Sequence, residues 1–390
     1  MRDAYIVESV RTPGCKNGRG LFKETRPEEL LSFIMKACVD KAGIDAGEID
    51  DTMIGCSFPE GEQGINIGRI ANQMAGFPES VSGATVNRFC SSGIEAIALA
   101  ALRIQAGWSD VTMGGGVESM TFVPMGGNTP RPHPEYANEN PAAYISMGVT
   151  AENVASRYGI TRQECDEFAV NSVAKAAKAQ EEGLFTEIVP TPAYRSVEQA
   201  DGTFKREQFL VDKDDGVRAG TTVEGIARLN SPFKAGGVAT AANSSQTTDG
   251  AAATLLMSLD KCEELGVKPI AKIVSYAVAG CKSDEMGIGP VFAIPKALKI
   301  AGLKVEDIDL FELNEAFSTQ ALYCSRELKL DMDKVNINGG AIALGHPLGC
   351  TGAKLTATLL ANLKRTGGKY GIVSMCIGGG MGACAVFEMV

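Results

Sequence analysis

The chain lacks the features of several broad protein classes. It has no apolar run near the roughly 18 residues that a membrane-spanning helix needs, and its first residues show no signal-peptide pattern. The 11 cysteines form no C-x-x-C pair and no cluster with the 2 histidines, which argues against a disulfide framework and a structural zinc site. We therefore expect a cytoplasmic protein with reduced thiols, no metal and no membrane span.

Positive charge is also scarce. The sequence holds 37 Lys and Arg residues against 47 Asp and Glu residues, which gives a formal net charge of -10. Binding to nucleic acid phosphates needs a basic surface, so a nucleic acid partner is not expected. An anionic small ligand would need a local basic patch.

An internal repeat indicates how the 390 residues are divided, since this length exceeds what one hydrophobic core usually organises. Residues 301–309 echo residues 42–50 at an offset of 259 positions (301 minus 42), and the same offset carries Gly93 onto Gly352. In each case an apolar strand that ends in a triple glycine follows, the glycines being residues 114–116 and 378–380. These matches predict two similar α/β halves.

The segment between the halves differs in composition, with prolines grouped between positions 124 and 141 and a helix predicted over 162–182. Such insertions often carry binding residues over a rigid scaffold. The alternative is a solvent-exposed surface loop without a binding role. The sequence therefore predicts three parts: 1–120 with 250–270 as the N-terminal half, 121–249 as an inserted loop domain, and 271–390 as the C-terminal half.

Cys90 lies where a short apolar strand meets a long Ala-rich helix. Free N–H groups and the positive end of the helix dipole would lower the pKa of its thiol and make it a nucleophile at neutral pH. The alternative is a small buried thiol beneath the start of the helix. Earlier in the chain, a helix is predicted over 27–42 and a strand over 52–56.

His346 is the stronger candidate base, because the other histidine, His133, lies in the Pro-rich insertion. His346 sits in a Gly-dense strand-to-helix turn, and the repeat offset maps it onto Asn87, three residues before Cys90. The alternative is a histidine that only forms structural hydrogen bonds.

Two further residues are candidates for the same site. Cys376 ends an apolar strand and precedes Gly378, whose backbone N–H would contribute to an oxyanion hole; the alternative is a buried strand cysteine. Asn314 lies where a strand gives way to a helix, and would either orient a water or cap that helix.

The chain resembles the thiolase family in motifs that occur in family order over essentially its whole length. They are Asn87-Arg88-Phe89-Cys90-Ser91-Ser92-Gly93, Gly115-Gly116-Val117-Glu118-Ser119-Met120, Asn314-Glu315-Ala316-Phe317, Gly345-His346-Pro347-Leu348-Gly349 and Cys376-Ile377-Gly378-Gly379-Gly380. The resemblance implies a five-layer α-β-α-β-α core of two similar halves with an inserted loop domain. It also implies acyltransferase chemistry on coenzyme A thioesters.

The resemblance further implies roles for individual residues. Cys90 would be the acylated nucleophile, His346 its base, and Cys376 the acid/base at the substrate C2 carbon. Asn314 would hold a water in one oxyanion hole with His346, and the N–H groups of Cys90 and Gly378 would form a second. Contacts to coenzyme A would come from Arg218, Ser245, Met147, Ala316 and Phe317. No tightly bound cofactor is implied, and a homodimer or homotetramer is expected.

Within the family, residues 243–250 and 374–378 look most like degradative 3-ketoacyl-CoA thiolases, the enzymes of fatty acid beta-oxidation. The alternatives are a biosynthetic acetoacetyl-CoA thiolase, a ketoacyl synthase, which usually needs two catalytic histidines, and a non-catalytic lipid-binding relative. The last would be expected to lose Cys90, His346 or Cys376, and all three are present. Residues 146–148 lack the histidine that many short-chain members carry before the Met, which leaves the acyl-chain preference open.

Overall fold

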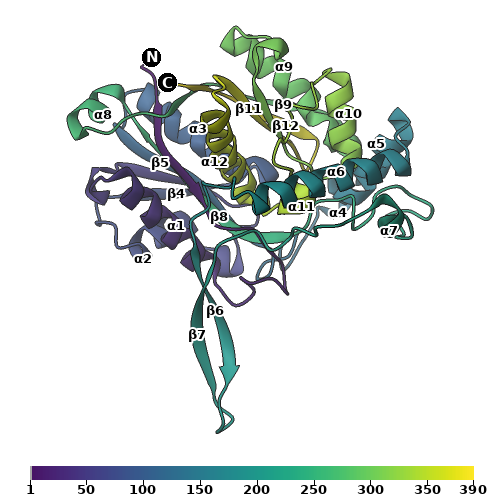
Figure 1. The fold of residues 1–390 in the computed structure, drawn as a ribbon, viewed down its shortest axis with the longest axis horizontal. Coiled ribbons are helices and arrows are strands. Elements are labelled where there is room, and N and C mark those ends of the chain that lie inside the picture. Colours follow the sequence, from purple (N-terminus) through teal and green to yellow (C-terminus); the bar gives the residue numbers. More distant parts are fainter. Residues whose placement is uncertain (1) are drawn as a thin grey trace.

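A computed structural model of the chain describes residues 2–390 (Figure 1). The strands are β1 (Tyr5–Arg11), β2 (Cys15–Lys16), β3 (Asp51–Gly55), β4 (Ser82–Val86), β5 (Val111–Ser119), β6 (Thr191–Glu198), β7 (Phe204–Val211), β8 (Thr248–Met257), β9 (Ala271–Gly280), β10 (Leu310–Leu313), β11 (Tyr370–Ile377) and β12 (Met381–Met389). The helices are α1 (Pro27–Ala42), α2 (Ile67–Met74), α3 (Ser92–Gln105), α4 (Pro134–Glu139), α5 (Met147–Tyr158), α6 (Arg162–Glu181), α7 (Val223–Ala227), α8 (Leu259–Leu265), α9 (Gly289–Ala301), α10 (Ser318–Glu327), α11 (Ala341–Leu344) and α12 (Leu348–Thr366). The predicted helix over 27–42 is confirmed, and the strand predicted over 52–56 begins and ends one residue earlier.

One ten-stranded sheet runs through the molecule in the order β10-β11-β12-β9-β1-β8-β5-β3-β4, with β2 paired to β8. Only Tyr5 and Ile6 of β1 pair with β9, so the sheet has a narrow junction there. On each side of this junction the strands repeat one pattern: β1-β8-β5-β3 corresponds to β9-β12-β11-β10 in order. In both sets the outermost pair is parallel and the others are antiparallel. The structure therefore contains two similar halves.

Three apolar cores show how helices cover these halves. One core packs α1 on the β1-β8-β5-β3 half, and another packs α9 on the β9-β12-β11-β10 half. The third, between the two halves, is built largely from α3 and α12, which lie side by side in the centre of Figure 1. The layers are thus α1, sheet, α3 with α12, sheet and α9, which is the expected α-β-α-β-α arrangement.

The repeat holds for most elements but not for the triple glycines. The offset of 259 carries the short 3-10 helix Ala46–Glu48 onto Val305–Asp307, and the start of β5 onto the start of β11. However, Gly114–Gly116 lie inside β5, whereas Gly379 and Gly380, with φ of 83° and 87°, make the turn after β11. The first set permits close packing on the central helices and the second forms a turn, so this part of the predicted repeat is wrong.

Residues between β5 and β8 include helices α4 to α7 and the β6-β7 hairpin, which projects from the body at the bottom of Figure 1. The predicted helix over 162–182 is confirmed as α6. Division of the chain into three parts stays a prediction.

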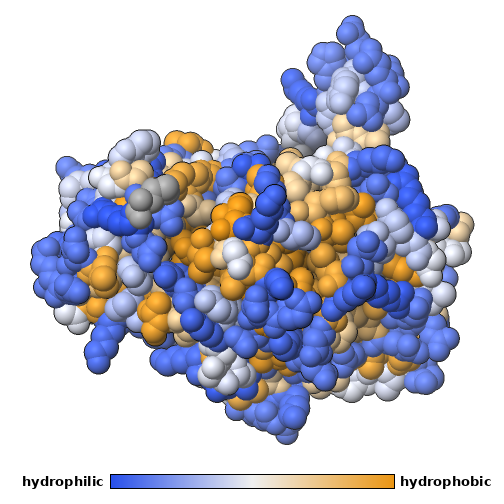
Figure 2. Space-filling view, turned by 90° about the horizontal axis from the view of Figure 1, so that it is seen from above, coloured by the Kyte–Doolittle hydropathy of each residue, from blue (hydrophilic) through white to orange (hydrophobic). Residues whose placement is uncertain are grey.

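Within residues 2–390, no helix combines the length and apolarity that crossing a bilayer requires. The face shown in Figure 2 carries a broad apolar area bordered by hydrophilic side chains.

The two glycines related by the repeat offset lie against each other where α3 crosses α12. A Cβ atom on Gly352 would lie 2.3 Å from the backbone nitrogen of Ile94, and one on Gly93 would lie 2.7 Å from the backbone nitrogen of Ala353. Real Cβ atoms do not approach backbone so closely, so the glycines allow the two helices to come close together.

Replacing Gly352 with Ala should therefore destabilise the fold by about 1–3 kcal/mol or more, because backbone rather than a side chain must move. Without this contact the same change would stabilise a helix by about 1 kcal/mol, so the sign of the effect decides. Urea denaturation of Gly352→Ala measures it. Lys364→Ala on the exposed side of α12 is the control, and an unchanged midpoint for Gly352→Ala would refute the close crossing.

Candidate active site

A tight turn places Cys90 at the start of α3. Phe89 has a left-handed backbone conformation with φ of 44°, which is uncommon for an aromatic residue and is typical of functional turns. The backbone N–H of Phe89 donates to Asn87 Oδ1 (2.8 Å), and the Ser92 hydroxyl donates to the Phe89 carbonyl (2.6 Å). The predicted position of Cys90 at a helix start is confirmed.

Burial, rather than the helix, decides the charge of Cys90. Enclosure raises the pKa of its thiol to about 11, against the opposing effect of the backbone N–H groups of Gly378 and of Cys90 itself. The expectation that the helix N-terminus lowers this pKa is wrong, because the loss of hydration of a thiolate outweighs the oriented N–H groups. Cys90 is a thiol at neutral pH and needs a base to become a nucleophile.

His346 lies in the turn between α11 and α12 and is 4% exposed. Its Nδ1 is 2.5 Å from Thr351 Oγ1, and its Nε2 is 3.4 Å from the Asn314 amide nitrogen. Since that nitrogen is a donor, Nε2 accepts and Nδ1 carries the proton. Burial and the positive charge of Lys354 lower the pKa of His346 to about 3, so the imidazole is neutral at pH 7, as a general base must be.

Asn314 follows β10 and is buried beside His346. It is not the cap of the next helix, because α10 begins after Phe317, and that alternative is wrong. Its Oδ1 atom has no hydrogen-bond partner among residues 2–390. A buried acceptor of this kind is available to a donor from outside the chain, such as a water or a substrate group.

Cys376 comes from the other half of the molecule and lies near Cys90. It is fully buried at the end of β11, and burial together with the nearby Cys90 holds the pKa of its thiol well above the ordinary value. A Cβ atom on Gly378 would lie 3.5 Å from Met147 Sδ and 3.8 Å from the Phe89 ring. The Gly378 turn is therefore enclosed by the Cys90 turn and the insertion.

Apolar residues surround Cys376. Met147, Ala316 and Phe317 pack in one cluster with it, as a wall of the site. Ser245 connects this wall to the rest of the insertion, because its backbone N–H donates to the Ala316 carbonyl (2.9 Å).

A cleft of about 260 Å³ adjoins this wall. It is lined by Lys16, Asn17, Arg19, Arg218, Pro232, Phe233, Thr240, Ala241, Ser244, Ser245, Gln246 and Thr247. Arg218 and Ser245 were expected here, whereas Lys16 and Arg19 were not. Burial and the positive charges of Arg218 and Arg19 lower the pKa of Lys16, so the three basic groups face one another in an otherwise acidic chain. The cleft is the local basic patch that an anionic ligand needs.

Glu118 is a further residue of the site to which the sequence assigned no role. Its buried carboxylate accepts the backbone N–H groups of Ser57 and Gly349 (both 2.8 Å) and the Gln63 amide (2.8 Å). Gly349 is in the first turn of α12, so Glu118 ties the loop after β3 to the helix that follows His346. The sequence signal that could have identified Glu118 is a single charged residue within an otherwise apolar strand.

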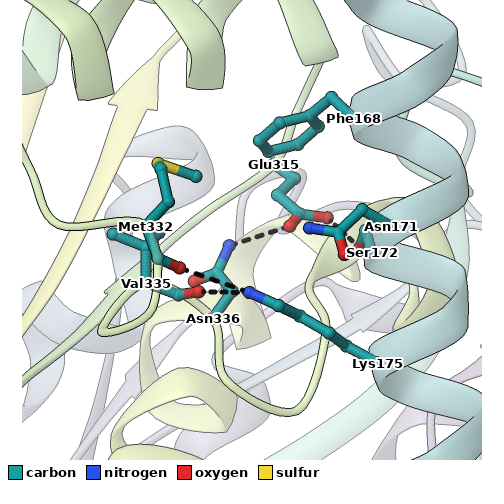
Figure 3. Close-up of a pocket in the computed structure, with 8 residues that line it drawn as sticks. All are labelled: Phe168, Asn171, Ser172, Lys175, Glu315, Met332, Val335 and Asn336. Atoms are coloured by element: carbon teal, nitrogen blue, oxygen red, sulfur yellow. Dashed lines mark hydrogen bonds between the residues drawn. The ribbon is translucent and has the colours of Figure 1, made fainter.

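Glu315, the residue after Asn314, has a buried carboxylate that contacts neighbouring elements (Figure 3). Its carboxylate accepts the Ser172 hydroxyl (2.7 Å), the Asn336 amide (2.9 Å) and the backbone N–H of Ile342 in α11. The pocket drawn there has a volume of about 10 Å³, which is the space of one water. It is too small for a substrate, and its residues hold the site in place.

Comparison with known proteins agrees with this geometry. The family description "Thiolase, N-terminal domain" matches residues 4–260, and "Thiolase, C-terminal domain" matches residues 267–389. A 3-ketoacyl-CoA thiolase of Bacillus subtilis is 50% identical over 390 residues, which is 100% of both chains. The peroxisomal 3-ketoacyl-CoA thiolase B of Rattus norvegicus is 49% identical over 99% of this chain and 91% of its own.

Solved structures are similar over the whole chain as well. The Bacillus anthracis acetyl-CoA acetyltransferase has a TM-score of 0.90 at 39% identity and covers 100% of this chain and 99% of its own. The dimeric peroxisomal thiolase of Saccharomyces cerevisiae has a TM-score of 0.88 at 38% identity, with coverage of 100% and 98%. The family matches cover the two similar halves seen in the structure, and the relatives are similar over the full length. The chain belongs to the thiolase family.

Proposed function

We propose that the protein is a 3-ketoacyl-CoA thiolase of fatty acid beta-oxidation, an acyltransferase that cleaves 3-ketoacyl-CoA with coenzyme A. The observation that carries the proposal is the pair of thiols, Cys90 and Cys376, brought together from the two halves beside a basic cleft. The curated relatives named above bear the same activity in their names. Thiolysis of a 3-ketoacyl-CoA, assayed against acetoacetyl-CoA, tests it.

The protonation states fit the first chemical step. Cys90 is a thiol and His346 is neutral at pH 7, so the imidazole takes the thiol proton as sulfur attacks the C3 carbonyl of the substrate. The C2–C3 bond then breaks, the shortened acyl group stays on Cys90, and the electron pair remains on the acetyl-CoA enolate. Cys376, whose raised pKa keeps it protonated, gives its proton to C2 of that enolate.

The second step restores the enzyme. The thiol of coenzyme A loses its proton to the Cys376 thiolate and attacks the acyl group on Cys90. The new acyl-CoA leaves, and Cys90 recovers its proton from the His346 imidazolium. One thiol cannot both hold the acyl group and move the C2 proton, which explains why two are needed.

Developing oxyanions need donors at two places. The backbone N–H groups of Gly378 and Cys90 point at the Cys90 sulfur and would stabilise the oxyanion of the acyl group. Asn314 and His346 would hold a water at the thioester oxygen of acetyl-CoA, an arrangement supported by the unpartnered Oδ1 atom of Asn314.

Coenzyme A enters as a substrate rather than as a resident cofactor. Its phosphates would bind Lys16, Arg19 and Arg218, and the apolar wall of Met147, Ala316 and Phe317 would line the path to Cys376. Ser245 lies between these two regions. We place the protein in the cytoplasm, where its cysteines, all free, would stay reduced.

The alternatives have less support. The curated relatives at 50% and 49% identity are both named 3-ketoacyl-CoA thiolase, whereas the solved acetyl-CoA acetyltransferase and peroxisomal thiolase are about equally similar, at 39% and 38%. A ketoacyl synthase would need a second histidine at the site, but His133 is exposed and caps α4 in the insertion.

Mass spectrometry after mixing with acetyl-CoA should find an acetyl group on the peptide that contains Cys90. The variant Cys376→Ser should still be acetylated there, because acyl transfer to the nucleophile needs no proton at C2. Its thiolysis rate should fall by orders of magnitude, since general acid–base catalysis contributes roughly 100-fold to 10,000-fold. Cys384→Ser, a buried cysteine of β12, is the matched control.

Label on another cysteine only would refute the role of Cys90. Cleavage by Cys376→Ser at the parent rate would show that Cys376 is a structural cysteine.

Replacing Arg218 with Ala should raise the KM for coenzyme A and leave kcat nearly unchanged, because a contact remote from the reacting atoms contributes uniform binding. Loss of one charged contact corresponds to an increase in KM of about tenfold. Steady-state kinetics measure both constants. Arg228→Ala, exposed in the same insertion but outside the cleft, is the control, and a collapsed kcat with unchanged KM would contradict this assignment.

We further propose that the chain forms a homodimer rather than a homotetramer, through the open edge of the sheet at β4. Ile65 near this edge is 99% exposed with φ of 66°, a conformation that is costly for a β-branched residue. Met74 at the end of α2 and Phe89 in the turn after β4 are also exposed. The similar yeast thiolase is described as dimeric.

Sedimentation velocity should show a dimer for the parent and a larger monomer fraction for Ile65→Asp, because a carboxylate would be buried at the contact. Ile300→Asp, exposed on α9, should remain dimeric. Identical sedimentation of all three proteins would place the contact elsewhere.

A further inference from the structure

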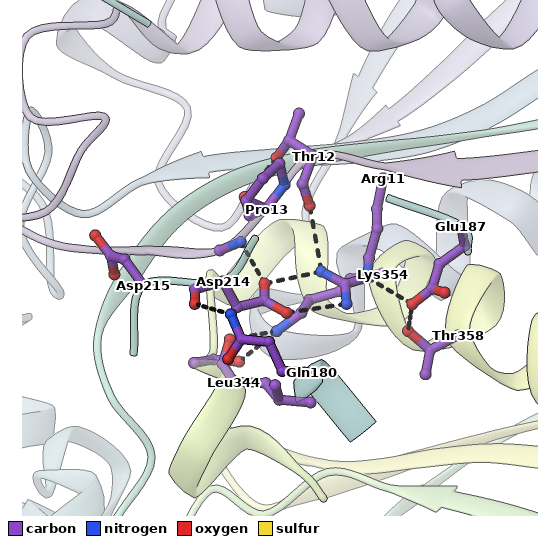
Figure 4. Close-up of polar contacts among 12 residues, drawn as sticks. Arg11, Thr12, Pro13, Gln180, Glu187, Asp214, Asp215, Leu344, Lys354 and Thr358 are labelled. Carbon is purple, nitrogen blue, oxygen red and sulfur yellow. Dashed lines mark hydrogen bonds and ion pairs between the residues drawn. The ribbon is translucent and has the colours of Figure 1, made fainter. Parts of the chain in front are cut away.

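A buried lysine, Lys354, contacts the segment that carries His346 (Figure 4). It is 3% exposed, and its Nζ donates to the carbonyls of Leu344 (2.6 Å) and Gly345 (2.9 Å), the two residues directly before His346. Lys354 lies three residues after Thr351, which contacts Nδ1 of His346, so both face the same side of α12. One helix therefore holds both the ring of His346 and the backbone before it.

Lys354 belongs to a closed group of buried charges. Arg11 of β1 is fully buried and forms a two-pronged pair with Asp214 (2.8 and 3.0 Å) and a third contact with Glu187 (3.0 Å). Asp214 also accepts the backbone N–H of Gly14 (2.6 Å). Two positive and two negative side chains thus share one enclosed region, and buried charges persist only when they are balanced in this way.

Asp214 keeps Lys354 charged. Burial lowers the pKa of Lys354 to about 8, and the attraction of Asp214 opposes that fall. The ammonium is therefore still protonated at pH 7. A positive charge at this place, next to the first turn of α12, opposes a second positive charge on the His346 imidazole.

We propose that Lys354 is a positioning residue that fixes the turn at Gly345 and opposes a positive charge on the His346 imidazole. The proposal rests on the proposed function, in which His346 is the base. A neutral imidazole takes the proton of Cys90, whereas an imidazolium cannot, so the charge of Lys354 extends the pH range of acylation downward. Further charged or titratable groups that face this region are Arg11, Glu118, Glu187, Asp214, Glu312 and Cys350.

The chain offers a direct readout, because His133 and His346 are its only histidines. With carbon-13 labelled histidine, each gives one imidazole resonance, and His133→Gln assigns them. In Lys354→Met the His346 titration should move upward by about one pH unit or more, although it stays below its ordinary value because burial remains. The acid limb of kcat/KM should move upward with it, and kcat should fall.

Two variants separate charge from shape. Lys354→Arg retains the charge and the donors, and should restore the parent pH profile. Lys364→Met removes an ammonium from the exposed side of the same helix. It should leave the His346 titration and the pH dependence of kcat/KM unchanged. If Lys354→Met does not fold, the same measurements on Lys354→Gln, which keeps a donor but loses the charge, decide the question.

An unmoved His346 titration in a folded, uncharged variant would overturn the proposal. A parent without thiolysis would instead refute the proposed function, and the resonance of His346 would still report on Lys354. The two failures are therefore distinguishable.

Discussion

The crossing of α3 and α12 places the start of one helix against the start of the other. Both helices begin at the centre of the molecule, and the paired glycines at 93 and 352 let them approach to backbone contact. Cys90 precedes one helix and His346 precedes the other. Because the two halves share one pattern, packing equivalent helices together also brings their first turns together. The candidate nucleophile and the candidate base therefore lie at equivalent turns of the two halves.

Burial sets the protonation of this centre. Enclosure raises the pKa of both Cys90 and Cys376 and lowers that of His346, so every group is neutral at rest. In the proposed reaction, each step moves one proton between such neutral groups. The N–H groups of Gly378 and Cys90 oppose this rise for the Cys90 thiol without reversing it, and in the proposed reaction they would stabilise the oxyanion of the acyl group.

Part of the fold and of the candidate site could be predicted from the sequence, because local residue chemistry determines it. Pro27 at the first turn and Gly43 in the left-handed conformation after the last define α1, as predicted. The repeat gave the two halves, and the Gly-dense turn located His346. The prediction that a triple glycine ends the strand in each half was wrong. Gly114–Gly116 allow close packing inside β5, whereas Gly379 and Gly380 form the turn after β11. Nothing in the sequence around Cys90 reveals its pKa, which depends on enclosure by distant segments.

Long-range contacts explain why the basic cleft was only half predicted. Lys16 and Arg218 are far apart in sequence, and Asp215 joins their segments by accepting the backbone N–H of Lys16 (2.8 Å). Its neighbour Asp214 pairs with Arg11 and faces Lys354. Two consecutive carboxylates thus serve two regions. Asp215 holds a segment that lines the cleft, and Asp214 belongs to the group of buried charges that includes Lys354. The insertion is therefore tied to the N-terminal segment at two places, by Asp215 at Lys16 of the cleft and by Asp214 at Arg11 of the buried charges.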